Sequence, residues 1–333
     1  MSNLKPMLQA ASLSKTFKVG SRFRAGGIQH LHALSEVSVD VYPGETLGLV
    51  GESGCGKSTL GRCLLRLYDV DDGRILFKDR EITHLSQREL RPLRADMQMV
   101  FQDPYSSLNP RRRVGDLIAE PLRVHGTQSE RDVRARLYEL MELVNLSTDF
   151  LTRFPHEFSG GQRQRIGIAR AIALSPSLIV ADEPVSALDV SVQAQIVNLF
   201  MDLQQKLGLT YVFIAHDLSV VRQIATRTAV MYLGGIVELG ETDRVLHSPA
   251  HPYTAALISA VPEPDPHGNI KTRTILKGEP PSPTNPPSGC RFHTRCPIAQ
   301  ERCTAEVPRL RAWGDEHFVA CHFPLDGSDD AHA

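Results

Sequence analysis

The chain has 333 residues, of which 41% are hydrophobic and 23% are charged, and its formal net charge is −1. This composition is typical of globular proteins of one or two domains and argues against a basic nucleic-acid-binding surface. Because the apolar runs are far shorter than the roughly 20 residues of a membrane span and no signal-peptide core is present, we expect a cytosolic chain with cysteines that are reduced, metal-bound or catalytic.

The N-terminal third predicts strands around one helix. Residues 7–50 alternate short β-like runs with turns, and Thr46–Val50 reads as a buried strand that runs directly into a glycine-rich loop. The segment that begins at Ser58 has a helical pattern, with one apolar face formed by Leu60, Cys63, Leu64 and Leu67. Residues 74–82 and 97–101 predict two further strands.

Residues 105–158 change to a helical pattern. Two amphipathic helices are expected, at 114–126 and 131–146, and the apolar stripe of the second consists of Val133, Leu137, Leu140, Met141 and Val144. After this insert the pattern predicts a helix at 159–174, a strand at 178–182, a helix at 191–207 and a strand at 210–215. This strand–helix alternation favours a parallel sheet.

Residues 51–58 match the phosphate-binding pattern G-x-x-x-x-G-K-[ST] between an expected strand and an expected helix. Glycines let backbone N–H groups surround a β-phosphate, Lys57 is expected to reach the β- and γ-phosphates, and Ser58 to hold Mg²⁺. A plain glycine turn before a helix is the alternative. The nucleotide-binding prediction from this loop covers Gly51, Glu52, Ser53, Gly54, Cys55, Gly56, Lys57, Ser58 and Thr59. For Cys55, a thiol pKa lowered by the helix end competes with a role as small loop filler.

Two carboxylates follow one another at the end of the strand 178–182. Asp182 is expected to meet Mg²⁺ directly or through water. Glu183 lies at the carboxyl end of the strand, where ligands of open α/β sheets bind, and can polarise an attacking water as a general base. A solvated turn acid is the alternative for Glu183.

A second candidate phosphate-binding helix end begins at Phe158, in the sequence FSGGQ. Ser159 can cap the helix, and Gly160 and Gly161 let backbone N–H groups approach a ligand. This helix end carries no lysine. A capped core helix with a closely packed glycine pair is the alternative.

In order and spacing, these motifs resemble the ATP-binding-cassette (ABC) proteins over roughly residues 7–245. Residues 51–58 and 178–182 resemble the Walker A and Walker B motifs, FSGGQ the signature motif, Gln102 the Q-loop glutamine and His216 the switch histidine. Phe17 lies where the family has an aromatic residue that stacks on adenine, although tyrosine is more usual there. The D-loop resemblance covers Ser186, Ala187, Leu188 and Asp189.

The resemblance implies an α/β fold: a P-loop NTPase (RecA-like) core with an N-terminal antiparallel β subdomain and an α-helical subdomain inserted at about 105–165. It implies ATP and Mg²⁺ as cofactors, with Gln102 also near the metal or water. Its catalytic residues would be Glu183, His216, Lys57 and Gln102. It also implies a head-to-tail dimer, in which the neighbour's site is completed by Ser159, Gly160, Gly161 and Gln162.

A nucleotide-binding domain of residues 1–262 is expected to be followed by a small Cys- and Pro-rich domain, 263–333, because residues 278–297 have no helical or strand period. The spacing C-x5-C-x6-C-x17-C joins Cys290, Cys296, Cys303 and Cys321. Four cysteines in a small segment with little core favour a metal staple, and four buried free thiols are the alternative. The wide spacing suits a 4Fe–4S cluster better than Zn²⁺, which remains the other metal.

Segments 101–122, 251–262 and 278–297 together resemble the dipeptide/oligopeptide importer branch of the family. This implies an ATP-hydrolysing subunit on the cytoplasmic face of the membrane that powers peptide uptake. Its partners would be a second ATPase subunit (a related chain or a copy of this one), two transmembrane permease subunits and, indirectly, an extracytoplasmic peptide-binding protein.

Two rival functions fit the sequence less well. A soluble ABC ATPase acting on nucleic acid or ribosomes is opposed by the near-zero net charge and the single cassette, so we expect no nucleic-acid partner. A regulatory module that binds ATP without turnover is opposed by the presence of Lys57, Asp182, Glu183 and His216.

Overall fold

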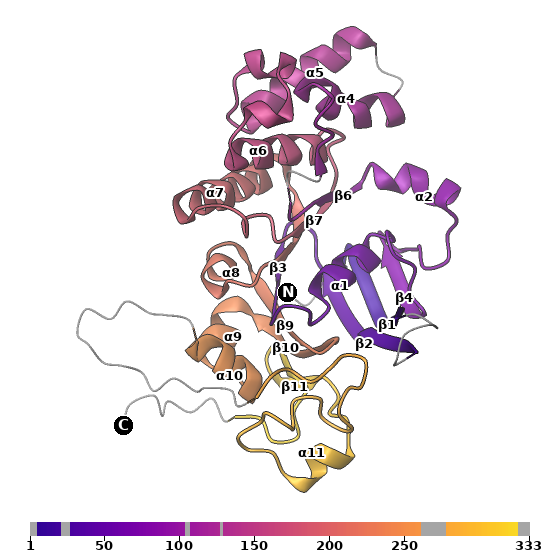
Figure 1. Cartoon of the computed structure of the whole chain (residues 1–333), viewed down its shortest axis with the longest axis vertical. Coiled ribbons are helices and arrows are strands. Elements are labelled where there is room, and N and C mark those ends of the chain that lie inside the picture. The colour runs from indigo at the N-terminus through magenta and orange to yellow at the C-terminus, as the bar shows by residue number, and fades with distance from the viewer. Residues whose placement is uncertain (1–4, 21–26, 104–106, 127–128, 261–277, 326–333) are drawn as a thin grey trace, which may run out of the picture.

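The computed structural model describes residues 5–20, 27–103, 107–126, 129–260 and 278–325. An α/β body occupies the middle of the molecule, a group of helices lies at one end, and the C-terminal segment lies at the other (Figure 1). In the described residues, no helix has the length and apolar character needed to cross a membrane.

The centre of the described fold is an eight-stranded sheet in the order β11-β12-β10-β9-β3-β8-β7-β6. Its parallel strands are β9 (Arg227–Tyr232), β3 (Thr46–Val50), β8 (Thr210–Ile214), β7 (Leu178–Asp182) and β6 (Met97–Val100). Strands β3, β7 and β8 are buried along their whole length, as expected for parallel strands covered on both faces. The prediction of a parallel sheet from strand–helix alternation is confirmed.

Helices cover this sheet. They are α1 (Lys57–Leu64), α7 (Val190–Leu207), α8 (Leu218–Ile224), α9 (Thr242–His247) and α10 (Pro252–Ser259). Helix α1 ends one turn earlier than the sequence pattern predicted, so Leu67 does not extend its buried face. The side chain of Leu67 is 44% exposed, whereas Leu60, Cys63 and Leu64 are buried.

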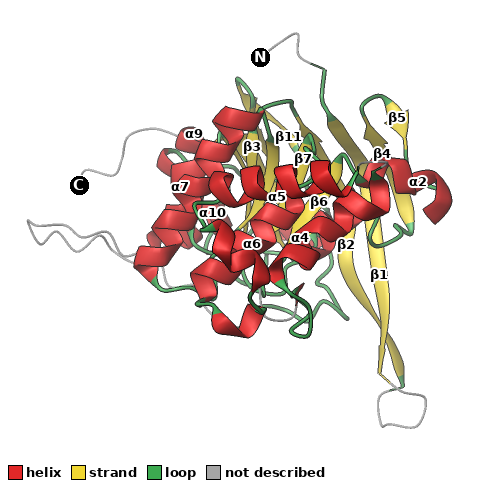
Figure 2. Cartoon of the chain, turned by 90° about the horizontal axis from the view of Figure 1, so that it is seen from above, coloured by secondary structure: helices red, strands yellow, loops and turns green. Residues whose placement is uncertain are grey.

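A second, antiparallel sheet in the order β2-β1-β4-β5 packs beside the first, which confirms the expected N-terminal subdomain. Its strands are β1 (Leu8–Gly20), β2 (Ile28–Val41), β4 (Asp72–Phe77) and β5 (Arg80–Glu81), followed by helix α2 (Gln87–Arg94). Figure 2 shows the β1–β2 ribbon projecting from the body. The single strand predicted at 74–82 is wrong, because Lys78 and Asp79 adopt positive φ angles of 50° and 62° and reverse the chain between β4 and β5.

The helical insert contains α4 (Val114–His125), α5 (Glu130–Leu143), two short 3₁₀ segments, η1 (Thr148–Thr152) and η2 (Pro155–Glu157), and then α6 (Gly160–Ala171). Helix α5 begins at a capping box in which Ser129 accepts from the Asp132 N–H and Asp132 from the Ser129 N–H. Its predicted apolar stripe is buried and belongs to the same core cluster as α4, α6 and the sheet.

The C-terminal segment extends the central sheet. It contains α11 (Glu301–Ala305), β11 (Arg311–Gly314) and β12 (His317–Val319), and β12 pairs antiparallel with β10 (Gly235–Glu241). The fully buried Glu238 of β10 accepts from the backbone N–H groups of Ala250 and His251 at 2.7 and 2.9 Å. His317 lies 2.7 Å from the same carboxylate, so one buried acid fastens β12 and the start of α10 to the sheet. The predicted domain boundary at 262/263 lies outside the described residues.

The buried imidazole of His251 predicts a pH-dependent stability. Burial lowers its pKa to about 4, against the opposing effect of Glu238, and Nδ1 accepts from the Tyr253 N–H at 3.0 Å. The unfolded chain binds a proton near pH 6.5 and the folded chain only near pH 4, so stability is complete above pH 6.5 and is lost as pH falls towards 4. His251→Asn keeps a cap acceptor but cannot take up a proton. Its free energy of unfolding should therefore fall by roughly 3 kcal/mol less than that of the unmodified protein when the pH is lowered from 7 to 4. Denaturant unfolding of both proteins between pH 7 and pH 4 measures it, and identical pH profiles would contradict the prediction.

Candidate functional site

The loop between β3 and α1 has a backbone that requires glycine. Gly51 and Gly56 adopt φ angles of 149° and 109°. A Cβ atom on Gly51 would lie 2.2 Å from the carbonyl oxygen of Met231, and one on Gly56 would lie 2.4 Å from the carbonyl oxygen of Ala33. These backbone contacts cannot yield without a shift of the neighbouring strands, so both positions require glycine.

Lys57 begins α1 and is 4% exposed. Its ammonium group donates to the carbonyl oxygens of Gly51 at 2.7 Å and Glu52 at 3.0 Å, so it lies across the loop. Burial raises the pKa of the neighbouring Cys55 thiol, which is 5% exposed. The structure therefore supports the interpretation of Cys55 as a loop filler and not as an activated thiol.

Ser58 and Asp182 meet although they are far apart in sequence. The Ser58 hydroxyl donates to Oδ1 of Asp182 at 2.6 Å. Oδ2 of Asp182 is buried and has no hydrogen-bond partner among the described residues, and Arg62 Nη2 lies 3.5 Å from it. Burial raises the pKa of Asp182, against the opposing effects of Ser58 and Arg62. A hydroxyl and a carboxylate with an unsatisfied oxygen are the hard donors that Mg²⁺ prefers, so these two residues fit the expected metal.

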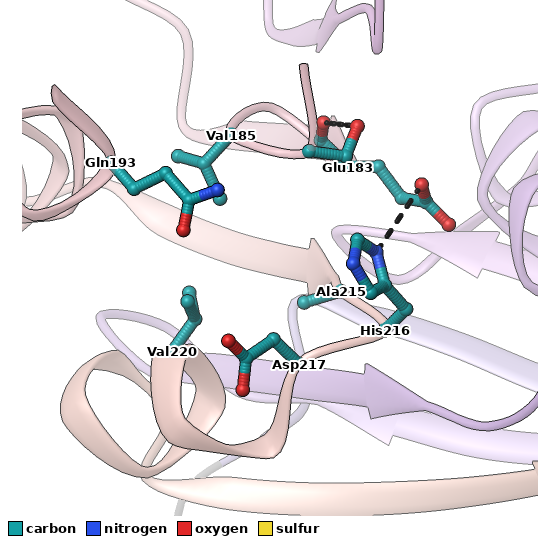
Figure 3. Close-up of a pocket in the computed structure, with 8 residues that line it drawn as sticks. Glu183, Val185, Gln193, Ala215, His216, Asp217 and Val220 are labelled. Carbon is teal, nitrogen blue, oxygen red and sulfur yellow. Dashed lines mark hydrogen bonds and ion pairs between the residues drawn. The ribbon is translucent and has the colours of Figure 1, made fainter. Parts of the chain in front are cut away.

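Glu183, Gln102 and His216 converge from the carboxyl ends of three adjacent strands. Gln102 follows β6 and donates from Nε2 to Oε2 of Glu183 at 2.8 Å. His216 follows β8, and its Nδ1 lies 3.6 Å from the same oxygen (Figure 3). Glu183 itself has a positive φ of 47°, held by a hydrogen bond from its N–H to the Ile214 carbonyl at 3.0 Å. A single carboxylate oxygen is thus oriented by two side chains.

A small cavity of about 30 Å³ adjoins Glu183 and is lined by Glu183, Val185, Ser186, Gln193, Ala215, His216, Asp217 and Val220. One water molecule needs roughly 10–15 Å³ of such space, so the cavity has room for water. Ser186 donates from its hydroxyl and its N–H to the Glu183 carbonyl, at 3.0 and 3.2 Å. The predicted D-loop is thus tied at Ser186 to the backbone of Glu183, and it ends at Asp189, which is exposed at the start of α7.

The signature residues form a capped, closely packed helix end. Gln162 donates its N–H to Ser159 Oγ at 3.3 Å, and Ser159 donates its N–H to Gln162 Oε1 at 3.0 Å. A Cβ on Gly161 would lie only 2.5 Å from Cγ1 of Val192 in α7, whereas one on Gly160 would lie 3.2 Å from Leu188. Helix α6 lies in the helical part of the molecule, apart from α1 (Figure 1). The signature residues therefore do not lie at the phosphate loop, residues 51–59, of the same chain.

Phe17 lies on β1 and is half-buried. Its ring packs edge-on against Tyr68, with 5.6 Å between the centroids, and Lys15 Nζ is 5.5 Å from its centroid. Stacking of Phe17 on adenine stays a prediction.

Sequence reasoning missed Arg295, which reaches the phosphate loop from the C-terminal segment. Its Nη1 and Nη2 atoms donate to the two carboxylate oxygens of Glu52 at 2.9 and 3.1 Å. The two residues are 243 positions apart, and no local pattern in the sequence signals the pair.

The four C-terminal cysteines interact electrostatically but do not form a ligand set. Burial raises the pKa of Cys321 to about 11, against the opposing effect of a backbone hydrogen bond at Phe323, and the thiols of Cys290, Cys296 and Cys303 act in the same direction as burial. The Cys290 N–H donates to the Cys303 carbonyl at 2.8 Å. Among the described residues, however, no group of three or more His, Cys, Asp or Glu side chains is arranged to hold a metal ion. The expected metal at these four cysteines is not supported by this arrangement and stays a prediction from the sequence.

Two family patterns match the chain. Residues 34–186 match the ABC transporter family, and residues 237–303 match the C-terminal region of oligopeptide/dipeptide transporters. The chain is 50% identical over 322 residues to the oligopeptide transport ATP-binding protein AppF of Bacillus subtilis, covering 96% of this chain and 98% of that protein. It is 51% identical to the oligopeptide transport ATP-binding protein OppF of Escherichia coli, covering 95% and 96%.

Solved structures agree on the fold. A dimeric post-hydrolysis state of the ATP-binding cassette MJ0796, bound to ADP and phosphate, is 29% identical with a TM-score of 0.64 and covers 71% of this chain and 99% of that one. The structure of CbiO1 from Clostridium perfringens is 26% identical with a TM-score of 0.63 and covers 72% and 90%.

The packing of α6 on α7 generates a stability prediction. Gly161→Ala should destabilise the fold by about 1–3 kcal/mol, because the new methyl group overlaps Val192. Gly167→Ala, in the same helix with open space around its Cβ position, is the matched control and should be neutral or stabilise by up to about 1 kcal/mol. Urea unfolding compares the two. The cost of Gly161→Ala should shrink in a Val192→Ala background, and an undiminished cost would contradict the assigned contact.

Proposed function

The chain belongs to the ATP-binding subunits of ABC transporters, in the oligopeptide/dipeptide branch, and from this premise we propose that it hydrolyses ATP to power peptide import. The observation that carries the proposal is the convergence of Glu183, Gln102 and His216 at the strand ends next to the Ser58–Asp182 pair. The rival function on nucleic acid or ribosomes finds no support in the relatives, whose names describe peptide transport.

The phosphate loop binds the nucleotide through backbone N–H groups and Lys57. Lys57 leaves its loop carbonyls for the β- and γ-phosphates, whose charge exceeds that of two carbonyl dipoles. Ser58 and Asp182 would hold Mg²⁺, which neutralises phosphoryl charge when bound. Glu183 accepts a proton from the attacking water, and Gln102 and His216 keep its carboxylate turned towards that water.

The second half of each site comes from a second cassette. We assign Ser159, Gly160, Gly161 and Gln162 to the neighbour's γ-phosphate, because the capped N-terminus of α6 presents a positive helix end away from its own phosphate loop. The exposed Ala187 and Asp189 of the D-loop would lie in the same interface. The dimeric state of the similar MJ0796 cassette supports this assembly, with a copy of this chain or a related chain as partner.

A groove of about 690 Å³ beside Gln102 suits the membrane partner. It is lined by residues of the sheet edge, of the helical insert and of the chain around α1 and α2, among them Leu67, Phe101, Gln102, Pro121 and Arg170. Leu67 and Phe101 are 44% and 38% exposed, which leaves apolar surface for a helix of a permease subunit. Two such permeases would hold the ATPase pair at the cytoplasmic face of the membrane, and an extracytoplasmic peptide-binding protein would deliver the substrate.

Glu183→Gln tests the general-base role. Turnover should fall by about 10²–10⁴, the usual contribution of a positioned general base, while ATP binding persists. The variant should also accumulate as an ATP-bound dimer in size-exclusion chromatography. Steady-state phosphate release measures turnover, with Glu142→Gln on the exposed face of α5 as the matched control. Wild-type turnover in Glu183→Gln would remove Glu183 from this role.

We further propose that Cys290, Cys296, Cys303 and Cys321 hold a structural metal, a 4Fe–4S cluster in preference to Zn²⁺. The spacing C-x5-C-x6-C-x17-C of the four cysteines supports this. Their side chains would have to draw together around the metal, because the described residues hold no group of three or more metal-ligating side chains. The metal would offset the small apolar core of this segment.

Anaerobically purified protein should be brown and contain about four iron atoms per chain. Serine at any one of the four positions should lower the iron content and expose the C-terminal segment to protease. Cys63→Ala in α1 should leave the iron unchanged. Colourless protein with one zinc would contradict the cluster, and metal-free, protease-resistant protein would contradict any metal staple.

A further inference from the structure

The segment Cys290–Cys296 of the C-terminal region docks directly on the phosphate loop. Arg295 makes a two-point contact with Glu52, the second residue of that loop, at 2.9 and 3.1 Å. The arginine side chain is 7% exposed and the glutamate side chain 25% exposed. Paired hydrogen bonds between ionised groups that are screened from water are among the stronger polar contacts in proteins.

The guanidinium remains charged in this setting. Burial acts to lower the pKa of Arg295, but its hydrogen bonds to Glu52 and Tyr232 outweigh burial and the pKa is raised. The charge of Glu52 is therefore matched by a cation from outside the loop. Without that cation, an ionised carboxylate would face the phosphates of any nucleotide bound in the loop.

Glu52 is held at three points. Its side chain binds Arg295, its N–H donates to the Tyr253 hydroxyl at 2.9 Å, and its carbonyl accepts from Lys57 Nζ at 3.0 Å. In the nucleotide-free loop, a displacement of Glu52 would thus move one of the carbonyls that hold Lys57. Arg295 of the C-terminal segment and Lys57 are therefore connected through one residue, Glu52.

The docked segment is itself rigidly placed. Phe292 is 1% exposed and packs against both Tyr232 and Tyr253, with centroid distances of 5.2 and 5.4 Å. Arg291 donates to Ser35 Oγ at 2.7 Å and to the Leu233 carbonyl. The next residue, Gly234, donates its N–H to the Cys55 carbonyl at 2.8 Å, which gives a second connection to the phosphate loop.

We propose that Arg295 is a positioning residue for the nucleotide site: by neutralising and fixing Glu52, it keeps the phosphate loop ready for a polyphosphate and couples the C-terminal segment to ATP binding. The inference rests on the proposed binding of ATP at Gly51–Thr59. It gives this segment a role in the affinity for nucleotide in addition to its packing on the sheet.

A double-mutant cycle on the full-length chain tests the pair, with Mg-ATP affinity measured by calorimetry. Arg295→Met should weaken binding about tenfold, the size expected for a lost charge-assisted contact. In a Glu52→Gln background the same change should cost less than about threefold, because no unpaired carboxylate remains. Equal costs in the two backgrounds would show that Arg295 does not act through Glu52 and would overturn the proposal.

Three further arms keep the outcomes distinct. Arg302→Met removes an exposed arginine paired with Glu306 in the same region and should leave the affinity unchanged. Lys57→Ala should abolish binding; if it does not, the proposed ATP site fails and not only the Arg295 contact. If Arg295→Met does not fold, Arg295→Lys replaces it in the cycle, because lysine keeps the charge but loses the two-point contact.

In the assembled transporter, Arg295→Met should raise the KM for ATP about tenfold and change kcat by less than about twofold, since the contact precedes the chemical step. A parallel loss of thermal stability with unchanged KM would instead identify a purely structural contact and contradict the proposal.

Discussion

The site depends on one constraint, the order β3-β8-β7-β6 of parallel strands whose carboxyl ends share an edge of the central sheet. Because the strands are parallel and adjacent, whatever follows each of them is delivered to the same edge. The phosphate loop follows β3, His216 follows β8, Glu183 follows β7 and Gln102 follows β6. The buried apolar residues of these strands fix that order, so the hydrophobic core and the polar site have the same origin.

The electrostatics of this edge are suited to a metal cation together with an anionic phosphate group. Burial raises the pKa of Asp182 and leaves one of its oxygens unsatisfied in the described structure. Lys57 donates its hydrogen bonds to two loop carbonyls, which are weaker partners than phosphate. Nucleotide and metal together would satisfy both groups, and the burial that penalises the free site would then strengthen the interactions of the loaded one.

Two regions of the chain serve packing and function with the same residues. Gly161 allows α6 to approach Val192 of α7, and it belongs to the helix end that we assign to a neighbouring subunit's phosphate. Phe292 fills an aromatic cluster, and the arginines on either side of it reach the phosphate loop and the turn beside it. In both regions, the structural interpretation and the functional one are compatible, because close packing is what fixes the geometry of the polar groups.

The sequence by itself determined the parallel core, the helical insert and the residues of the phosphate loop, because these features depend on local patterns: apolar strands, helical periodicity and glycines next to a lysine. It also placed Asp182 and Glu183 at a strand end. The sequence did not determine the reversal at Lys78–Asp79, the exposure of Leu67 or the strands β11 and β12. Each of these features depends on how other segments of the same chain pack around it. The contacts between Ser58 and Asp182 and between Arg295 and Glu52 join residues 124 and 243 positions apart. Only the tertiary structure decided them, because a hydrogen bond between distant segments exists only after the strands between them have been ordered in the sheet.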